Sequence, residues 1–421
     1  MAQPVQHGKA ALGFIFVTVF IDVLGLGIII PILPKLLEEL GHTDISMASQ
    51  YSGYLTFTYA SMQFLFAPVL GNLSDKVGRR PVLLVSLLGF GVDYALMAFA
   101  PTLAWLFVGR FIAGIAGASS TTATAYIADV STGDKRAANF GLIGAATGLG
   151  FILGIGMGGF LGAIWIKLPF IVAAGLALLN AVYGFFILPE SLSLKNRRRF
   201  EWKRANPIGS LFRLRHYSLA VSTLITAYTI VYIGQKAIES TLPFYLIEKF
   251  KWTLPSISSL GIFIGLLIAA IQGGVVRWSI PKFGLRKNIM AGIAFYGIGL
   301  ALIAFNNVGW LMYVYMIPYC LGGLGGTALQ GFISEHVSPK EQGELQGALA
   351  SLVSITTVIG PLMMTTLFHH FTTADAPVYF PGAPFLMGAV LMFISIILTI
   401  RSFKKKDPNQ GNTVPPALPL H

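Results

Sequence analysis

The chain has 421 residues, of which 55% are hydrophobic and only 11% are charged. Soluble domains carry about 25% charged residues, so this composition excludes an ordinary soluble protein. The net charge of +12 would suit a nucleic-acid binder. However, the basic residues lie in a few short segments between long apolar runs, which is the pattern of membrane-protein loops.

Twelve apolar runs with few charges follow one another along the sequence. Each has the length that a helix needs to cross a hydrocarbon core of about 30 Å, and helices satisfy their own backbone hydrogen bonds in lipid. The sequence therefore predicts an all-α membrane protein with twelve transmembrane helices. The expected spans are 11–34, 51–71, 82–100, 103–125, 138–162, 167–188, 217–247, 256–277, 287–305, 309–333, 345–367 and 382–401.

The first run has no small-residue cleavage site at its end, so we interpret it as helix one and not as a signal peptide. A basic segment divides the runs six and six. We expect an N-terminal six-helix bundle over 1–190, a basic linker over 191–216, a C-terminal six-helix bundle over 217–405 and a disordered tail over 406–421.

Lysine and arginine predict the orientation. Of the 29 basic residues, 23 fall on the side of both termini and the linker, and four fall on the other side. Positive residues concentrate in cytoplasmic loops. We therefore expect a multi-pass protein of the cytoplasmic (inner) membrane with both termini in the cytoplasm.

The two halves of the sequence resemble each other at a nearly constant offset. Pro34 corresponds to Pro243, an offset of 209, and Gly154 corresponds to Gly360, an offset of 206. Chance similarity between glycine-rich helices is the alternative. Two six-helix repeats place a substrate cavity between the halves near the middle of the bilayer in transporters built this way.

The connection between helices two and three reads GNLSDKVGRRP from Gly71 to Pro81. It resembles the signature loop of the major facilitator superfamily, G-x-L-S-D-[KR]-x-G-R-[RK]-P. A plain positive loop is the alternative. We expect a gating loop in which an aspartate pairs with arginines or faces a helix N-terminus. Its residues are Gly71, Asp75, Lys76, Gly78, Arg79 and Arg80.

Longer stretches resemble one branch of that superfamily. The segments Phe20–Leu37, Gly78–Pro101, Gly109–Asp129 and Glu341–Leu362 are similar to those of the tetracycline-resistance efflux family. Members exchange a drug–metal complex for a proton. The resemblance implies a drug:proton antiporter that confers antibiotic resistance and whose substrate is itself a metal chelate. No cofactor is implied.

Five ionisable residues lie inside the expected membrane region: Asp22, Asp93, Arg110, Lys236 and Glu239. Such residues cost about 2.5–3.5 kcal/mol each at the bilayer centre and usually serve function. In the family, the acid that corresponds to Asp22 belongs to the substrate and proton pathway. The alternative for Asp22 is a structural cap on a broken helix. We predict that Asp22, Asp93 and Glu239 couple transport to protons.

Asp93 and Arg110 lie at equal depth on adjacent helices, so we expect them to pair, either as a static ion pair or as part of the coupling. Lys236 and Glu239 stand three residues apart on one face of helix seven. They either bind substrate or neutralise each other.

The predicted substrate-binding residues are polar groups at similar depth. They are Asp22, Gln63, Asp93, Arg110, Gln235, Lys236 and Gln272. Gln235 matches a glutamine of the family. For each uncharged member, an ordinary hydrogen bond between helices is the alternative.

Three positions depart from the family pattern. Helix five carries Ile155 where antiporters of the superfamily have a proline, helix eight carries Ile268 where the tetracycline pumps have a histidine, and Tyr296 replaces an acid of helix nine. A histidine relay is therefore excluded.

We predict a secondary active transporter that exports a tetracycline-like or other amphipathic drug in exchange for protons by alternating access. A proton-coupled symporter or facilitator for a metabolite is the second hypothesis. A membrane enzyme is the third and the least supported, because the sequence has no metal-ligand cluster, nucleotide-binding loop or nucleophile elbow. The expected partners are a small molecule, protons and lipid, without nucleic acid.

Overall fold

The computed structural model describes residues 7–131, 133–202, 206, 209, 217–338 and 341–404, with only the backbone for 7–11 and 133–138. The expected tail 406–421 and much of the expected linker lie outside the described residues. The described part is helical and contains no strand. The helices of the N-terminal half are α1 (His7–Gly41), α2 (Ile45–Val77), α3 (Arg79–Phe99), α4 (Leu103–Gly117), α5 (Ser120–Val130), α6 (Gly133–Ile164) and α7 (Leu168–Ile187).

A short 3₁₀ turn, η1 (Leu194–Asn196), follows in the connection between the halves. The C-terminal half contains α9 (Leu219–Phe250), α10 (Leu254–Ala270), the π-helical segment η4 (Ile271–Val275), α11 (Val276–Phe283), α12 (Leu285–Ala304), α13 (Leu311–Leu321), α14 (Gly323–Glu335), α15 (Gln342–Thr372) and α16 (Ala383–Lys404).

Nine helical stretches in the described part of the chain are long and apolar enough to cross a membrane. The three other expected spans are α2, α9 and the pair α13–α14, and each has a reason to fall below that measure. The helix α2 is rich in polar side chains, α9 carries the Lys236–Glu239 pair, and the stretch of α13 and α14 is rich in glycine.

Three expected helices are interrupted, which the sequence interpretation did not predict. The fourth is divided at Ala118–Ser119, the tenth is divided at Gly322, and the eighth passes through η4. Glycines and small polar residues at these points weaken the helix relative to a turn. The divisions in the fourth and tenth helices lie at nearly corresponding positions of the sequence repeat.

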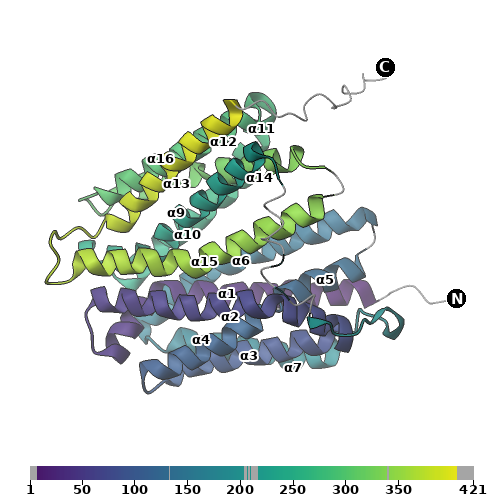
Figure 1. The fold of residues 1–421 in the computed structure, drawn as a ribbon. Coiled ribbons are helices and arrows are strands. Elements are labelled where there is room, and N and C mark those ends of the chain that lie inside the picture. The colour runs from purple at the N-terminus through teal and green to yellow at the C-terminus, as the bar shows by residue number, and fades with distance from the viewer. Residues whose placement is uncertain are drawn as a thin grey trace.

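The helices run along a common direction, and the two ends of the described chain lie at the same end of the molecule (Figure 1). Within the N-terminal half α1 packs on α6, and α3 packs on α7; within the C-terminal half α9 and α12 pack on α16. The halves contact each other mainly through α2 with α15 and through α6 with α10.

Backbones approach closely where α1 crosses α6. A Cβ atom on Gly154 would lie 2.2 Å from the carbonyl oxygen of Leu24, and one on Gly158 would lie 2.5 Å from that of Ile28. Small residues four apart permit this contact, and close packing is the main source of helix association in lipid. The crossing fixes α1, and therefore Asp22, against α6.

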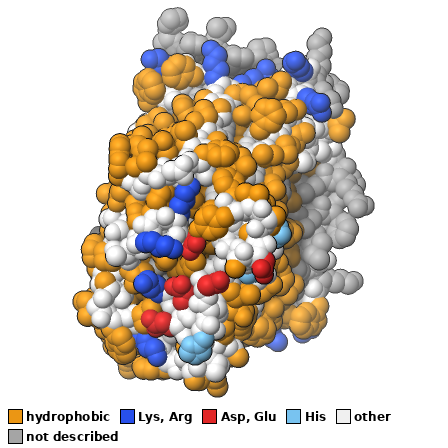
Figure 2. All heavy atoms as spheres, turned by 90° about the vertical axis from the view of Figure 1, so that its left-hand side faces the viewer, with side chains coloured by type: hydrophobic (Ala, Val, Ile, Leu, Met, Phe, Trp, Pro, Cys, Tyr) orange, Lys and Arg blue, Asp and Glu red, His pale blue; other side chains and the backbone are white. Residues whose placement is uncertain are grey.

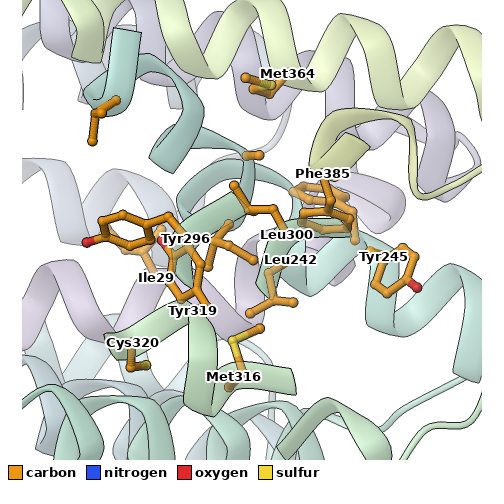
Figure 3. Packing of buried hydrophobic residues seen from close by; sticks show 14 of the residues in the cluster. Ile29, Leu242, Tyr245, Tyr296, Leu300, Met316, Tyr319, Cys320, Met364 and Phe385 are labelled. Atoms are coloured by element: carbon orange, nitrogen blue, oxygen red, sulfur yellow. The ribbon is translucent and has the colours of Figure 1, made fainter. Parts of the chain in front are cut away.

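The main apolar core reaches into the C-terminal half, where Tyr296 of α12 and Tyr319 of α13 pack edge to face at 5.2 Å between ring centroids (Figure 3). The end of the molecule opposite the termini looks different from this core. Charged side chains gather in the middle of that face, with hydrophobic ones around them (Figure 2). Near the C-terminal end of α9, Glu248 accepts a hydrogen bond from Tyr379 and pairs with Lys251.

Candidate transport site

Asp22 lies near the middle of α1 and lines a cavity of about 280 Å³. Its Oδ1 atom is buried and has no hydrogen-bond partner among the described residues. A buried polar atom without a partner is unusual and indicates a role outside static structure or a ligand. Because α1 runs unbroken through this position, the structure offers no broken helix for Asp22 to cap.

The cavity also contains Tyr59 and Gln63 of α2. Gln63 donates from Nε2 to the carbonyl oxygen of Gly117 at 3.2 Å. That carbonyl belongs to the last residue of α4, where the fourth helix is interrupted. Gln63 therefore satisfies a backbone group released by the break, and its carbonyl oxygen remains available to a ligand.

Asp93 and Arg110 form a buried ion pair between α3 and α4, through a hydrogen bond from Arg110 Nη2 to Asp93 Oδ2. Gly109 leaves room for the carboxylate, because a Cβ atom there would lie 2.7 Å from Asp93 Oδ1. The guanidinium also lies 5.7 Å from the centroid of the Tyr59 ring. Tyr59 thus touches the pair on one side and the cavity of Asp22 on the other.

Lys236 and Glu239 pair on α9, with 2.5 Å between Nζ and Oε2. The lysine side chain is only 9% exposed, whereas that of the glutamate is 53% exposed. The stem of Lys236 lies over Gly360 of α15, where a Cβ atom would come within 2.6 Å of its Cγ atom. The buried ammonium group of Lys236 therefore pairs with the carboxylate of Glu239, which remains half-exposed.

The predicted binding residues do not form one cluster. Asp22 and Gln63 line the same cavity, while Asp93, Arg110, Gln235, Lys236 and Gln272 do not line it. Gln235 is half-buried on α9, and Gln272 is exposed inside η4. Short π-helical segments occur frequently at functional sites.

The segment that the sequence predicts as a gating loop is mostly helical. Gly71, Asp75 and Lys76 lie in the last turns of α2, and Gly78 alone separates α2 from α3. Asp75 pairs with Arg79 at 2.6 Å, and Arg79 also reaches Asp129 at 3.4 Å. Gly78 has φ of +112°, a conformation that favours glycine. Lys76 is exposed. The aspartate therefore pairs with an arginine, which is one of its two expected arrangements.

Sequence reasoning missed two acids of this network. Glu190 accepts hydrogen bonds from the backbone N–H groups of Arg79 and Arg80 at 2.8 and 3.3 Å, so it caps the N-terminus of α3. Asp129 pairs with Arg79 from the end of α5. The sequence shows both acids near the ends of predicted helices, but only the fold brings them to Arg79 and Arg80.

The three departures from the family pattern have structural consequences. Ile155 keeps its amide, α6 continues through it, and its side chain packs against Gly261 of α10. Ile268 lies on α10 with 36% of its surface exposed. The ring of Tyr296 fills the space left by Gly322 at the interruption of the tenth helix.

No group of three or more His, Cys, Asp or Glu side chains that could hold a metal occurs in the part of the chain that the structure describes. What the fold does provide is a set of ionisable side chains held among helices long enough to span a membrane, one of which, Asp22, lines a cavity. This arrangement defines a secondary transporter.

Comparison with known proteins agrees. The family model of the Major Facilitator Superfamily matches residues 15–282 and 224–418. The solved structure of the nucleoside transporter NupG superposes with a TM-score of 0.74 at 13% identity, covering 96% of this chain and 100% of that one, and so shows the same fold.

Curated relatives narrow the class. The class C tetracycline resistance protein of Escherichia coli is 41% identical, covering 92% of this chain and 95% of its own length. The class G protein of Vibrio anguillarum is 37% identical, covering 91% and 95%. The chain is a transporter of the Major Facilitator Superfamily and not an enzyme, and within that superfamily it belongs to the family of the tetracycline resistance proteins.

Proposed function

We propose that the protein is an antiporter of the cytoplasmic membrane that exports tetracycline or a similar amphipathic drug in exchange for protons. The names of its relatives support the drug class. The observation that carries the proton coupling is the position of Asp22, which lines a cavity and whose buried Oδ1 atom has no hydrogen-bond partner among the described residues. A carboxylate in that position can take up a proton or bind a cationic substrate, but not both at once.

In this proposal both termini are cytoplasmic, and residues 1–190 move against 217–405. The hydrogen bonds between the halves among the described residues support such a movement, because they lie toward the end opposite the termini. Thr372 donates to Ser46 Oγ at 2.7 Å, and Ser258 donates to the carbonyl oxygen of Ile155 at 2.7 Å. The arrangement is that of a carrier closed on its outer side.

In the same proposal, other ionisable and polar side chains take part in coupling and in substrate binding. The Asp93–Arg110 pair and Glu239 assist the coupling, while Lys236, Gln63, Gln235 and Gln272 contact the substrate. The loop from Gly71 to Arg80 holds the cytoplasmic ends of the halves together in the opposite state. The pairing of Asp75 with Arg79 supports this role, since it keeps a charge network assembled at that end.

The test uses inverted membrane vesicles with an acidic interior. The wild-type protein is expected to accumulate tetracycline, because an exporter turned inside out pumps inward and is driven by proton exit. Asp22→Asn keeps the size of the side chain but cannot bind a proton reversibly, so accumulation is expected to be lost at normal expression. Glu39→Gln on the exposed end of α1 is the matched control. Full accumulation by Asp22→Asn would refute the role of Asp22, and efflux from wild-type vesicles would indicate a symporter.

A further inference from the structure

The ion pair of Lys236 and Glu239 on α9 joins a buried cation to an accessible carboxylate. The lysine side chain is buried, whereas that of the glutamate is half-exposed. Glu239 lies inside the expected span 217–247, and a charged group that faces lipid is costly. Besides its neighbours in the C-terminal half, α9 contacts α1 and α2 of the N-terminal half. The exposed carboxylate therefore faces the space between the halves, where a solute can reach it.

Tyrosine side chains lie close to this carboxylate. Tyr296 of α12 and Tyr319 of α13 are near enough to Glu239 to interact with it electrostatically. Tyr232 interacts in the same way with Tyr296. It precedes Glu239 by about two helical turns, so it lies on the same face of α9. Aromatic rings attract cations, and the carboxylate adds a full negative charge, so this combination suits an organic cation with an apolar body.

A second ion pair on the same helix shows what is unusual about the first. Glu248 and Lys251 have the same spacing near the C-terminal end of α9. There the lysine side chain is 76% exposed and the glutamate side chain is 17% exposed, so the cation moves freely in water. The stem of Lys236 is instead packed over Gly360 through its Cβ and Cγ atoms. Its ammonium group is therefore held beside Glu239, and any other cation that binds there must displace it.

We propose that Glu239 binds the cationic group of the substrate and that Lys236 is a built-in competitor, which the substrate displaces. The ligand is an amphipathic organic cation whose apolar body lies against Tyr232 and Tyr296. In the empty site the lysine neutralises the carboxylate, so neither charge is left unpaired in the membrane region. When the ligand binds, the end of the lysine beyond its packed stem turns toward the water that Glu239 faces. The inference rests on the proposed function and specifies the class of its substrate.

The experiment measures binding and does not depend on transport. Purified protein is titrated with tetraphenylphosphonium, an organic cation of fixed charge, in an isothermal titration calorimeter. Glu239→Gln is expected to raise the Kd at least about tenfold, because the cation loses its charged partner. Lys236→Met keeps an unbranched stem over Gly360 and is expected to lower the Kd about tenfold, because the competing ammonium group is gone.

Two kinds of control accompany these variants. Glu248→Gln and Lys251→Met change the matched pair on α9 and are expected to keep the Kd within about twofold of wild type. The double variant Lys236→Met/Glu239→Gln replaces both charges by side chains of similar size, so it leaves no unpaired charge in the membrane region. It is expected to bind the cation as weakly as Glu239→Gln does. If Glu239→Gln does not fold, the double variant alone decides.

Each outcome separates the binding site from the transport function. Wild-type affinity in Glu239→Gln or in the double variant would overturn the site, as would a wild-type protein that does not bind the cation. A Kd of Lys236→Met that equals or exceeds that of wild type would overturn the competition, and the proposal with it. A wild-type protein that binds the cation through Glu239 but does not accumulate tetracycline in vesicles would contradict the proposed function and leave the cation site standing.

Discussion

At the scale of single residues, the ion pair of Asp93 and Arg110 shows how a buried charge is kept in the membrane region. Asp93 is fully buried, and Arg110 donates both to it and to the sulfur of Met97 at 3.0 Å. Asp93 Oδ1 and Arg110 Nε have no partner among the described residues. The pair is therefore held by few contacts, and each partner depends on the other.

Removing one partner is expected to cost more than removing both charges. Arg110→Gln leaves an unpaired carboxylate, and breaking a buried pair in this way costs about 3–5 kcal/mol. The double variant Asp93→Asn/Arg110→Gln is expected to recover most of the thermal stability, measured by fluorescence-monitored melting of purified protein. A double variant that is stable but does not transport would identify a coupling role, and one that is stable and active would identify a static pair. A single variant as stable as wild type would contradict the ion-pair argument.

At the scale of helices, the contact between α1 and α6 depends on glycines. The Cβ atoms of residues at 150, 154 and 158 would each lie within 2.6 Å of a carbonyl oxygen of α1. Corresponding contacts in the C-terminal half differ, because the stem of Lys236 crosses Gly360 there. Gly360 of the eleventh helix therefore corresponds to Gly154 in the repeat, but it makes room for the side chain of Lys236 and not for a neighbouring backbone.

Gly154→Ala is expected to push α1 away from α6, with a loss of stability of about 1–3 kcal/mol from overpacking. Gly148→Ala, on the same helix, meets no atom within 4 Å and is the control. The midpoints of thermal unfolding of the two variants give the comparison. Equal midpoints would show that the crossing tolerates a methyl group.

At the scale of the whole molecule, the contacts between the halves lie toward the end opposite the termini. Ser46 near the start of α2 contacts the His369 ring at 3.0 Å and Thr372 at 2.7 Å. Nearby, a Cβ atom on Gly53 would lie 2.0 Å from Thr365 Oγ1. An alternating-access cycle must break these contacts each time the carrier opens on this side.

Locking these contacts is expected to stop transport. In Ser46→Cys/Thr372→Cys the two sulfurs replace hydroxyls already in contact, so oxidation should join α2 to α15. Tetracycline accumulation in inverted vesicles should be lost on oxidation and return on reduction, with either single variant unaffected. Continued transport by fully cross-linked protein would show that this end does not open.

Local patterns in the sequence predicted the all-helical fold, the class of protein and the identities of the ionisable membrane residues. The reason is that hydrophobic length and intramembrane charge are properties of short segments. The free energy of each segment in the bilayer depends little on its neighbours. The pairing of Lys236 with Glu239 follows from the same local spacing.

The spacing of Asp93 and Arg110 on adjacent helices also predicted their pair, but only the tertiary structure decided which of the more distant residues meet. Glu190 caps α3 across more than a hundred residues of sequence, and the cavity of Asp22 draws its hydroxyls from several helices. The interruptions of the fourth and tenth helices were also invisible, because glycine and serine in a membrane run are compatible with both a helix and a break. Contacts between distant segments arise from packing, and packing depends on the shapes of all the helices together.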